Sequence, residues 1–438
     1  MAIDTVTTPA VVGSFTPGAF ANHLATLEGA PAWWIERKRK AYAAFAGALM
    51  PRRTDEGWRF SSYSSLSLDG YLTGPKAPGT VPADLIKVAA AASLTFRNGQ
   101  LAGARGVDAS LDREGVVVAP LSQAISSHAE LLRAHFMAQP QKLGSEKFAA
   151  LHTAFVTDGA FVYIPKGVHV KDPIVISHRA SGSGTAVFPH TLVVAEENSS
   201  VTVVDLFSSE DSAAHFACGA NDLYAGHGST LRYVAAQAWS KDTLSFQFNS
   251  TVARRDAHVQ SLNVHLGGKQ ARHESLSQLQ APGAVSEMLA VTVARSEQEF
   301  DQRTLQIHQA PNTKSDLLYK NALLDKAHTI FSGLIVVDPD AQKTDAYQSN
   351  RNLMLSDEAE ANALPGLEIQ ANDVRCTHGA TSSRIDAEQE FYLQSRGIDR
   401  ALADELLVFG FFEEVLSRLE NEEIHEALRG LIRSRFSK

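Results

Sequence analysis

Cysteine is scarce in this chain, and the signals that would assign it to a membrane, to secretion or to a nucleic acid are missing. Two cysteines among 438 residues are too few for a disulfide framework and fit a reducing cytosol. No stretch approaches the ~18 consecutive apolar residues of a membrane span. The N-terminus lacks the basic start and apolar run of a signal peptide, and a net charge of −9 argues against a nucleic-acid-binding surface. We therefore expect a cytoplasmic protein with neither membrane nor nucleic acid as a partner.

Familiar catalytic motifs are also missing. The sequence contains no G-x-x-x-x-G-K-[ST] phosphate loop, no G-x-G-x-x-G, no H-E-x-x-H, no C-x-x-C and no G-x-S-x-G nucleophile elbow. These patterns supply the groups that many ATPases, oxidoreductases and hydrolases need at fixed spacing. We expect a protein that is not an enzyme, and any nucleotide chemistry linked to its function must come from a partner.

Composition and periodicity divide the chain into three parts. A hydrophobic content of 44% and a charged content of 20% are typical of soluble globular proteins, and the length exceeds what one simple core organises. Residues 1–145 combine helical spacing with short apolar runs and turns, which predicts a mixed α/β N-terminal domain. Residues 146–385 are β-rich, and residues 386–438 return to a helical period.

The helical C-terminal segment is unusually rich in aromatic residues. Phe409, Phe411 and Phe412 lie together on a predicted helix whose apolar stripe also includes Leu402 and Leu406. A thin pair of helices packed on one narrow end of a β-domain does not bury so many large side chains. The pattern therefore predicts that part of this stripe is a groove or knob for a partner.

The central region consists of short runs rich in Val, Thr, Tyr and Phe, as strands should be. Their starts recur roughly every 14 residues, and Gly, Asn, Asp and Ser separate them rather than helices. Such a pattern favours a solenoid in which each coil buries its face by stacking on the next, although an antiparallel meander has the same signature. Two strands per coil would give about 28 residues per coil. The runs are Phe161–Ile164, Ile174–Ile176, Thr191–Val194, Val201–Leu206, Leu231–Val234, Phe246–Val252, Val259–Val264, Met288–Val293, Leu317–Tyr319 and Ile330–Val337.

A thiol and an imidazole lie two residues apart where the β-rich region ends. If the chain around Cys376 and His378 is a strand, alternation directs both side chains to one face, about 7 Å apart along the chain. Zinc and iron accept both ligand types, but a tetrahedral site needs about four donors. The pair is thus either a packed thiol beside a structural histidine or half of a metal site that another chain completes. The second cysteine, Cys218, is predicted to be a packed core thiol.

Two longer stretches resemble a known family. One holds C-T-H-G-A-T (376–381) followed by F-Y-L-Q-S-R-G-I (391–398), and the other is the run K-S-D-L-L-Y-K-N-A-L-L-D from Lys314, continuing through A-Q-K-T-D-A-Y-Q-S-N-R-N-L-M-L-S to residue 356. They resemble the SufB/SufD family, the scaffold subunits of the Suf iron–sulfur cluster assembly machine, and the block around the histidine looks like the SufD version.

The resemblance implies a fold, partners and a site. It implies a right-handed β-helix with about two strands per coil, a SufB partner on the C-terminal part of that helix, and the ATPase SufC bound by the C-terminal helices. In the family the histidine of this motif, here His378, is tied to iron acquisition, and Cys376 is its neighbour. Iron or a nascent cluster would then be held at the SufB interface rather than by this chain alone. A homodimer of the isolated chain is a further expectation.

Two alternatives differ in class. A β-helix carbohydrate enzyme would need carboxylates converging in a groove, and the cluster of Asp338, Asp340 and Asp345 better fits a turn. A purely structural interaction protein would differ from a metal-handling scaffold only at Cys376 and His378. The amide row of Gln348, Asn350 and Asn352 is predicted to satisfy backbone groups of a coil, with a partner-facing surface as the second interpretation.

Overall fold

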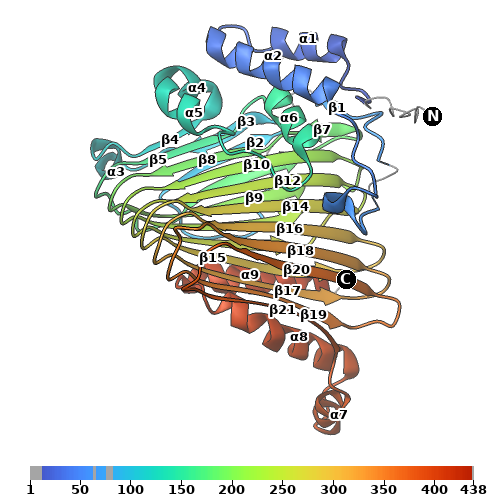
Figure 1. Ribbon diagram of the computed structural model, residues 1–438. Helices are drawn as coiled ribbons and strands as arrows, with labels where there is room; N and C mark the ends of the chain where they lie inside the picture. Colours follow the sequence, from blue (N-terminus) through green and yellow to red (C-terminus); the bar gives the residue numbers. More distant parts are fainter. Residues whose placement is uncertain (1–11, 63–65, 75–81, 437–438) are drawn as a thin grey trace, which may run out of the picture.

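The central region forms two long parallel sheets that face each other along a β-solenoid (Figure 1). The computed structural model describes residues 12–62, 66–74 and 82–436. Sheet A follows the order β20-β18-β16-β14-β12-β10-β8-β5-β4, with β7 and β1 beside this path, and sheet B follows β21-β19-β17-β15-β13-β11-β9-β6-β2-β3. Because consecutive strands from β8 to β21 alternate between the sheets, each coil contributes one strand to each. The predicted mainly-β solenoid with two strands per coil is confirmed.

The strands of the two sheets have the following bounds. Sheet A contains β1 Leu72–Thr73, β4 Val117–Pro120, β5 Ala160–Ile164, β7 Thr185–Val187, β8 His190–Ala195, β10 Phe216–Ala225, β12 Leu244–Ala253, β14 Gln270–Leu279, β16 Glu299–His308, β18 His328–Val337 and β20 Glu360–Ile369. Sheet B contains β2 Ala92–Arg97, β3 Gln100–Arg105, β6 Ile174–Ala180, β9 Ser200–Ser209, β11 Thr230–Ala238, β13 His258–His265, β15 Val285–Ala294, β17 Lys314–Leu323, β19 Asp345–Met354 and β21 Arg375–Arg384.

The register of the sheets gives the length of a coil. Phe216 pairs with Leu244, an offset of 28 residues, and Leu244 pairs with Gln270, an offset of 26. Near the C-terminal end, Asp345 pairs with Arg375, an offset of 30. These offsets agree with the expected 28 residues. All ten strand runs predicted from the sequence fall inside observed strands.

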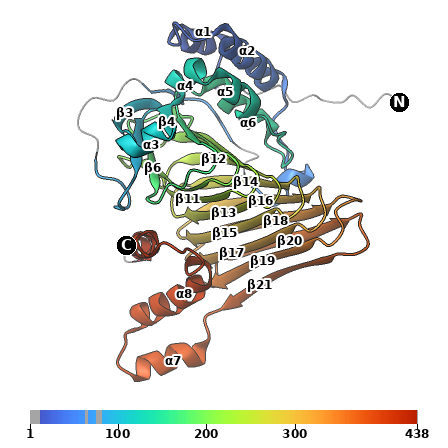
Figure 2. The same cartoon turned by 90° about the vertical axis from the view of Figure 1, so that its left-hand side faces the viewer.

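The N-terminal segment closes one end of the solenoid and covers the outer face of sheet A (Figures 1 and 2). Strand β2 pairs with β6 in sheet B and β4 pairs with β5 in sheet A, so this segment extends both sheets. An aromatic core that includes Trp34, Phe45 and Phe148 packs its helices on Phe216 and Phe246 of sheet A. The helical elements are α1 Pro17–Ala25, α2 Ala32–Gly47, η1 Glu56–Trp58, α3 Ala109–Arg113, α4 Leu121–Ser127, α5 Ala129–His135 and α6 Glu146–Phe155.

The three C-terminal helices are α7 Ala387–Ser395, α8 Arg400–Leu416 and α9 Glu422–Phe436. Helices α8 and α9 cover the outer face of sheet B. Phe409 and Phe412 are buried against Val204, Leu262 and Leu318 of the sheet. The prediction that these aromatics form a partner surface is therefore wrong for Phe409 and Phe412, because the helices lie along the broad face of a sheet rather than on a narrow end.

The apolar stripe of α8 is also shifted from its predicted phase. Leu402 and Leu406, which the sequence analysis placed in one stripe with Phe409, are 43% and 42% exposed. Val408 and Phe412 are buried in their place. In the described part of the chain no helix is both long and apolar enough to cross a lipid bilayer.

Candidate functional site

Cys376 and His378 lie on β21, the last strand of sheet B (Figure 2). On the parallel ladder Cys376 stacks on Ala346 and His378 on Gln348. The side chains of Ala346 and Gln348 are buried between the two sheets, and in-register neighbours on a ladder point to the same side. The thiol and the imidazole therefore share the inward-facing side of the final coil, as alternation predicted, at the rim of the solenoid.

The two side chains differ in burial. Cys376 is half-buried and packs near Leu367 and Val374 at the rim of a small apolar cluster, whereas His378 is exposed. Burial raises the pKa of the Cys376 thiol, with the charge of Asp345 adding to the rise and a backbone hydrogen bond from Ala346 opposing it. Since a metal binds the thiolate, Cys376 must lose its proton on binding. The imidazole of His378 is exposed, so no comparable burial opposes the approach of a metal.

The pair does not form a complete metal site within this chain. Among the described residues, the only group of three or more His, Cys, Asp or Glu side chains close enough to share an ion is Glu422, His425 and Glu426 on α9. That group belongs to a surface ion-pair network, in which His425 Nε2 lies 3.1 Å from Glu413 Oε1. Cys376 and His378 thus offer at most two ligands.

The other thiol is a core residue. Cys218 is fully buried on β10, and its Sγ lies 3.3 Å from the carbonyl oxygen of Phe148 in α6. Burial raises the pKa of this thiol well above its usual value. The prediction of a packed core thiol is confirmed, and Cys218 takes no part in the candidate site.

The amide row of β19 also lies inside the protein. Gln348, Asn350 and Asn352 have side chains that are at most 2% exposed. Gln348 donates to the carbonyl oxygen of Gly333 at 3.3 Å, and Asn352 donates to Asn350 Oδ1 at 2.9 Å. The prediction that the row satisfies groups of the coil is confirmed for Gln348, and burial excludes the alternative of a partner-facing surface.

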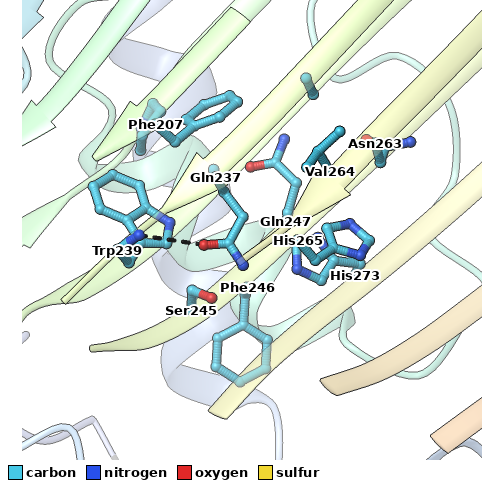
Figure 3. Close-up of a pocket in the computed structure, with 14 residues that line it drawn as sticks. Phe207, Gln237, Trp239, Ser245, Phe246, Gln247, Asn263, Val264, His265 and His273 are labelled. Carbon is cyan, nitrogen blue, oxygen red and sulfur yellow. Dashed lines mark hydrogen bonds between the residues drawn. The ribbon is translucent and has the colours of Figure 1, made fainter. Parts of the chain in front are cut away.

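A small cavity between the sheets contains two stacked histidines (Figure 3). The rings of His265 and His273 have centroids 3.8 Å apart and an interplanar angle of 28°. Nitrogen lone pairs lie in the ring planes, so those of nearly parallel rings do not converge on one ion. A volume of about 20 Å³ admits about one water. Burial lowers the pKa of His273 to about 3, against the opposing charge of Asp301. We interpret both histidines as neutral structural residues.

Large apolar residues are exposed on α7 and at the start of α8, and the sequence analysis missed those on α7. Phe391 and Tyr392 are 72% and 56% exposed, and Leu402 and Leu406 are also exposed. A sequence signal was available: two adjacent aromatic residues on one helix point about 100° apart, so a single packing face does not bury both. We call these four residues the α7–α8 apolar surface.

Comparison with known proteins identifies the family. The family model described as "SUF system FeS cluster assembly, SufBD core domain" matches residues 178–411, and the model of the SufBD protein N-terminal region matches residues 87–176. The chain belongs to the SufBD family. The match to the core-domain model begins inside β6. The boundary between the two family regions therefore falls within the first coils of the solenoid.

Individual relatives agree with this family. The chain is 31% identical over 327 residues to the iron–sulfur cluster assembly protein SufD of Bacillus subtilis, a match that covers 74% of each chain. It is 29% identical over 302 residues to SufD of Escherichia coli, covering 68% of this chain and 71% of the relative. A SufBD family protein of Synechocystis is 28% identical over 415 residues, 92% of this chain and 91% of the relative. The protein is thus a SufD-type iron–sulfur cluster assembly protein.

Proposed function

We propose that this protein is a non-catalytic scaffold subunit that pairs with a SufB subunit through the open end of its solenoid. The observation that carries the proposal is the position of Cys376 and His378 on β21, at the rim of that end. Strands β20 and β21 are the terminal strands of their sheets in the described part of the chain. A terminal strand has one row of unpaired backbone groups and is a template for another strand.

Iron or a nascent iron–sulfur cluster is the proposed cargo of this interface. A thiolate and an imidazole are ligand types that iron accepts, and ligands from SufB would complete the coordination. The same open end gives the isolated chain a route to a homodimer, since two copies would each supply an unpaired strand. Binding of SufB and self-association would then compete for β20 and β21.

The C-terminal helices are the proposed docking site for the ATPase SufC, which would supply the nucleotide chemistry. The α7–α8 apolar surface supports this proposal, because large exposed apolar side chains on neighbouring helices are a common feature of protein interfaces. A helix that presents such residues fits a groove on its partner. Phe391 and Tyr392 are proposed to be the main contacts, since large aromatic residues often dominate the energy of an interface.

Copurification of the tagged full chain with SufB and SufC tests both contacts. Removing residues 400–438 would expose the buried face of sheet B and unfold the protein, so point variants are required. The double variant Phe391→Ser with Tyr392→Ser should lower the affinity for SufC about tenfold or more and leave SufB bound. The matched control is Leu101→Ser, which removes an exposed leucine of the distant strand β3.

The SufB contact needs a change at the other surface. Ala363→Pro on β20 would add a bulky ring at the open end and should reduce SufB recovery while SufC stays bound. Full recovery of SufB would remove the open end from the proposed interface. Retention of SufC by the double aromatic variant would remove the α7–α8 apolar surface from the proposed docking site.

A further inference from the structure

A cleft far from Cys376 and His378 lies where turns of the solenoid meet the end of α9. The turns between β11 and β12, between β13 and β14 and between β15 and β16 enclose it together with Arg435, and its volume is about 590 Å³. Sites for small molecules commonly occupy about 300–1,000 Å³. Four cationic residues line the cleft: Lys241, Lys269, Arg295 and Arg435.

Three of these cations recur with the period of the coil. Lys241 and Lys269 are 28 residues apart, which is the offset of the β11–β13 ladder, whereas Lys269 and Arg295 are 26 apart, slightly less than the offsets of 27 and 29 on the β13–β15 and β14–β16 ladders. They therefore occupy successive turns, and neighbouring coils of a sheet lie about 4.8 Å apart. Lys326, in the next turn, has Glu358 at 3.4 Å. No carboxylate of the described residues lies within ion-pair distance of Lys241, Lys269 or Arg295.

The two arginines are close to each other and partly removed from water. Arg295 Nη1 donates to the backbone carbonyl oxygen of Arg435 at 2.7 Å. Burial lowers the pKa of Arg435, and the charge of Arg295 lowers it further. Asp242 and Glu297 also line the cleft, but neither is within ion-pair distance of the cations, and the lining retains a positive balance in a chain whose net charge is −9. Like charges that line one cleft without a counter-ion repel one another, and a bound anion would relieve this repulsion.

We propose that this cleft binds a phosphate-bearing small molecule of mononucleotide size. The planar forks of Arg295 and Arg435 match the oxygens of a phosphate group, and Lys241 and Lys269 add charge at the cleft mouth. Trp239 and Leu266 also line the cleft and are almost fully buried, which gives it an apolar floor for the rest of the ligand. The site is independent of the SufB and SufC contacts proposed above.

Isothermal titration of the full chain with inorganic pyrophosphate, ADP and adenosine, at low ionic strength without metal, tests the proposal. We expect pyrophosphate and ADP to bind and adenosine not to bind. Arg295→Gln with Arg435→Gln should weaken both ligands about tenfold or more, because each guanidinium contributes charge-assisted hydrogen bonds. Because the contact from Arg295 to α9 also stabilises the fold, Lys241→Gln with Lys269→Gln is a second variant, in which two exposed lysines change and a several-fold loss is expected.

The control removes two cations from a different turn. Arg254 and Arg255 are exposed residues of the turn between β12 and β13, and Arg254→Gln with Arg255→Gln should leave both affinities unchanged. An equal loss in this control would mean that ADP binds to diffuse charge and would overturn the site. The proposal also fails if neither phosphate ligand binds at about millimolar concentration, if adenosine binds as well as ADP, or if both cleft variants bind like the wild type.

Discussion

Polar residues have opposite environments on the covered face of sheet A and at the open end of the solenoid. On the covered face, charged side chains of β14 and β16 lie beneath the N-terminal segment: Arg272, Glu274 and Asp301 are at most 2% exposed, and Arg272 contacts both carboxylates. At the open end, His378 is exposed on a terminal strand. Polar residues on the covered face hold the chain together, and those at the open end are available to a second subunit.

This comparison shows which polar residues are expected to act on a partner. Several histidines beneath the N-terminal segment have perturbed pKa values, but their neighbours belong to the same chain, as where His152 Nε2 meets His190 Nδ1 at 3.0 Å. A perturbed pKa is therefore a sign of burial there rather than of function. Acidification and substitution should affect the stability of the covered face strongly and that of the open end weakly.

Acidification should have the largest effect, because the buried histidines are neutral in the fold. In the unfolded chain each takes up a proton near pH 6.5, and two buried carboxyls, Asp205 and Asp222, oppose this because burial raises their pKa to about 7. Because the buried histidines outnumber these carboxyls, the unfolded chain binds more protons, and the free energy of unfolding should fall by about 1.4 kcal/mol per pH unit for each net proton between about pH 6 and 4. Urea unfolding at several pH values measures it. The histidines, with pKa values lowered to about 3 or 4, are His23, His152, His178, His273 and His308.

The two carboxyls provide a signed control. Each stays protonated in the fold up to about pH 7 but ionises near pH 3.8 when unfolded, so each stabilises the fold increasingly as the pH falls. Asp205→Asn with Asp222→Asn removes that opposing contribution, and stability should then fall more steeply, by about 3 kcal/mol per pH unit more than in the wild type. An unchanged slope would contradict the protonated state of these carboxyls.

The next largest effect is expected where the N-terminal segment is fastened to sheet A. Arg272 donates to the carbonyl oxygens of Gly57 and Leu143, each at 2.7 Å, and its guanidinium lies 4.0 Å from the centre of the Trp58 ring. Arg272→Met should cost about 3–5 kcal/mol, because it leaves Glu274 buried without its cation and Asp301 with Arg303 as its remaining cation. Urea unfolding measures the loss. Arg254→Met, at an exposed turn, should change stability by less than about 0.5 kcal/mol, and a similar small loss for Arg272→Met would show that the network is solvated.

The sequence predicted one face of the solenoid better than the other. Among the long strands, the runs that the sequence analysis identified include every strand of sheet B from β9 to β17, but β10, β14, β16 and β20 of sheet A were missed. Strands β14 and β16 carry Arg272, Glu274, Asp301 and Arg303 toward the N-terminal segment and polar side chains toward the interior, so neither face has an apolar pattern. Periodicity detects strands that bury apolar groups and not those that bury ion pairs.

The candidate site was predictable in part. Alternation correctly predicted that Cys376 and His378 share one face, because the direction of side chains along a strand is determined by the backbone alone. Their location at the rim depends on which coil of the solenoid is the last one. The sequence indicated the last coil only by the end of the β-rich pattern. Of the α7–α8 apolar surface, Leu402 and Leu406 lie in the stripe that was predicted to include a partner surface, but Phe391 and Tyr392 were missed. Within α8, tertiary packing buried Val408 and Phe412, which the phase of the predicted stripe did not distinguish from its exposed members.

The smallest effect on stability is expected at the open end, together with a large effect on iron. His378→Ala should change the free energy of unfolding by less than about 0.5 kcal/mol, because the side chain is exposed. It should nevertheless lower the iron content of the complex with SufB and SufC, measured after anaerobic loading, more than Cys376→Ala does. The imidazole is exposed to a partner, whereas burial keeps the thiol protonated, so metal binding there must also displace a proton.

Thr377→Ala is the matched control, since Thr377 lies between the two residues and points to the opposite face of β21. It should change neither stability nor iron content. Equal iron loading of the wild type and His378→Ala would leave the open end as a purely structural interface. A loss of iron from all three variants alike would mean that any change to β21 disturbs strand pairing with SufB. The proposal therefore requires that iron content falls in the His378 and Cys376 variants but not in the Thr377 variant, and that it falls more for His378. Only this pattern shows that β21 supplies metal ligands and does more than pair with SufB.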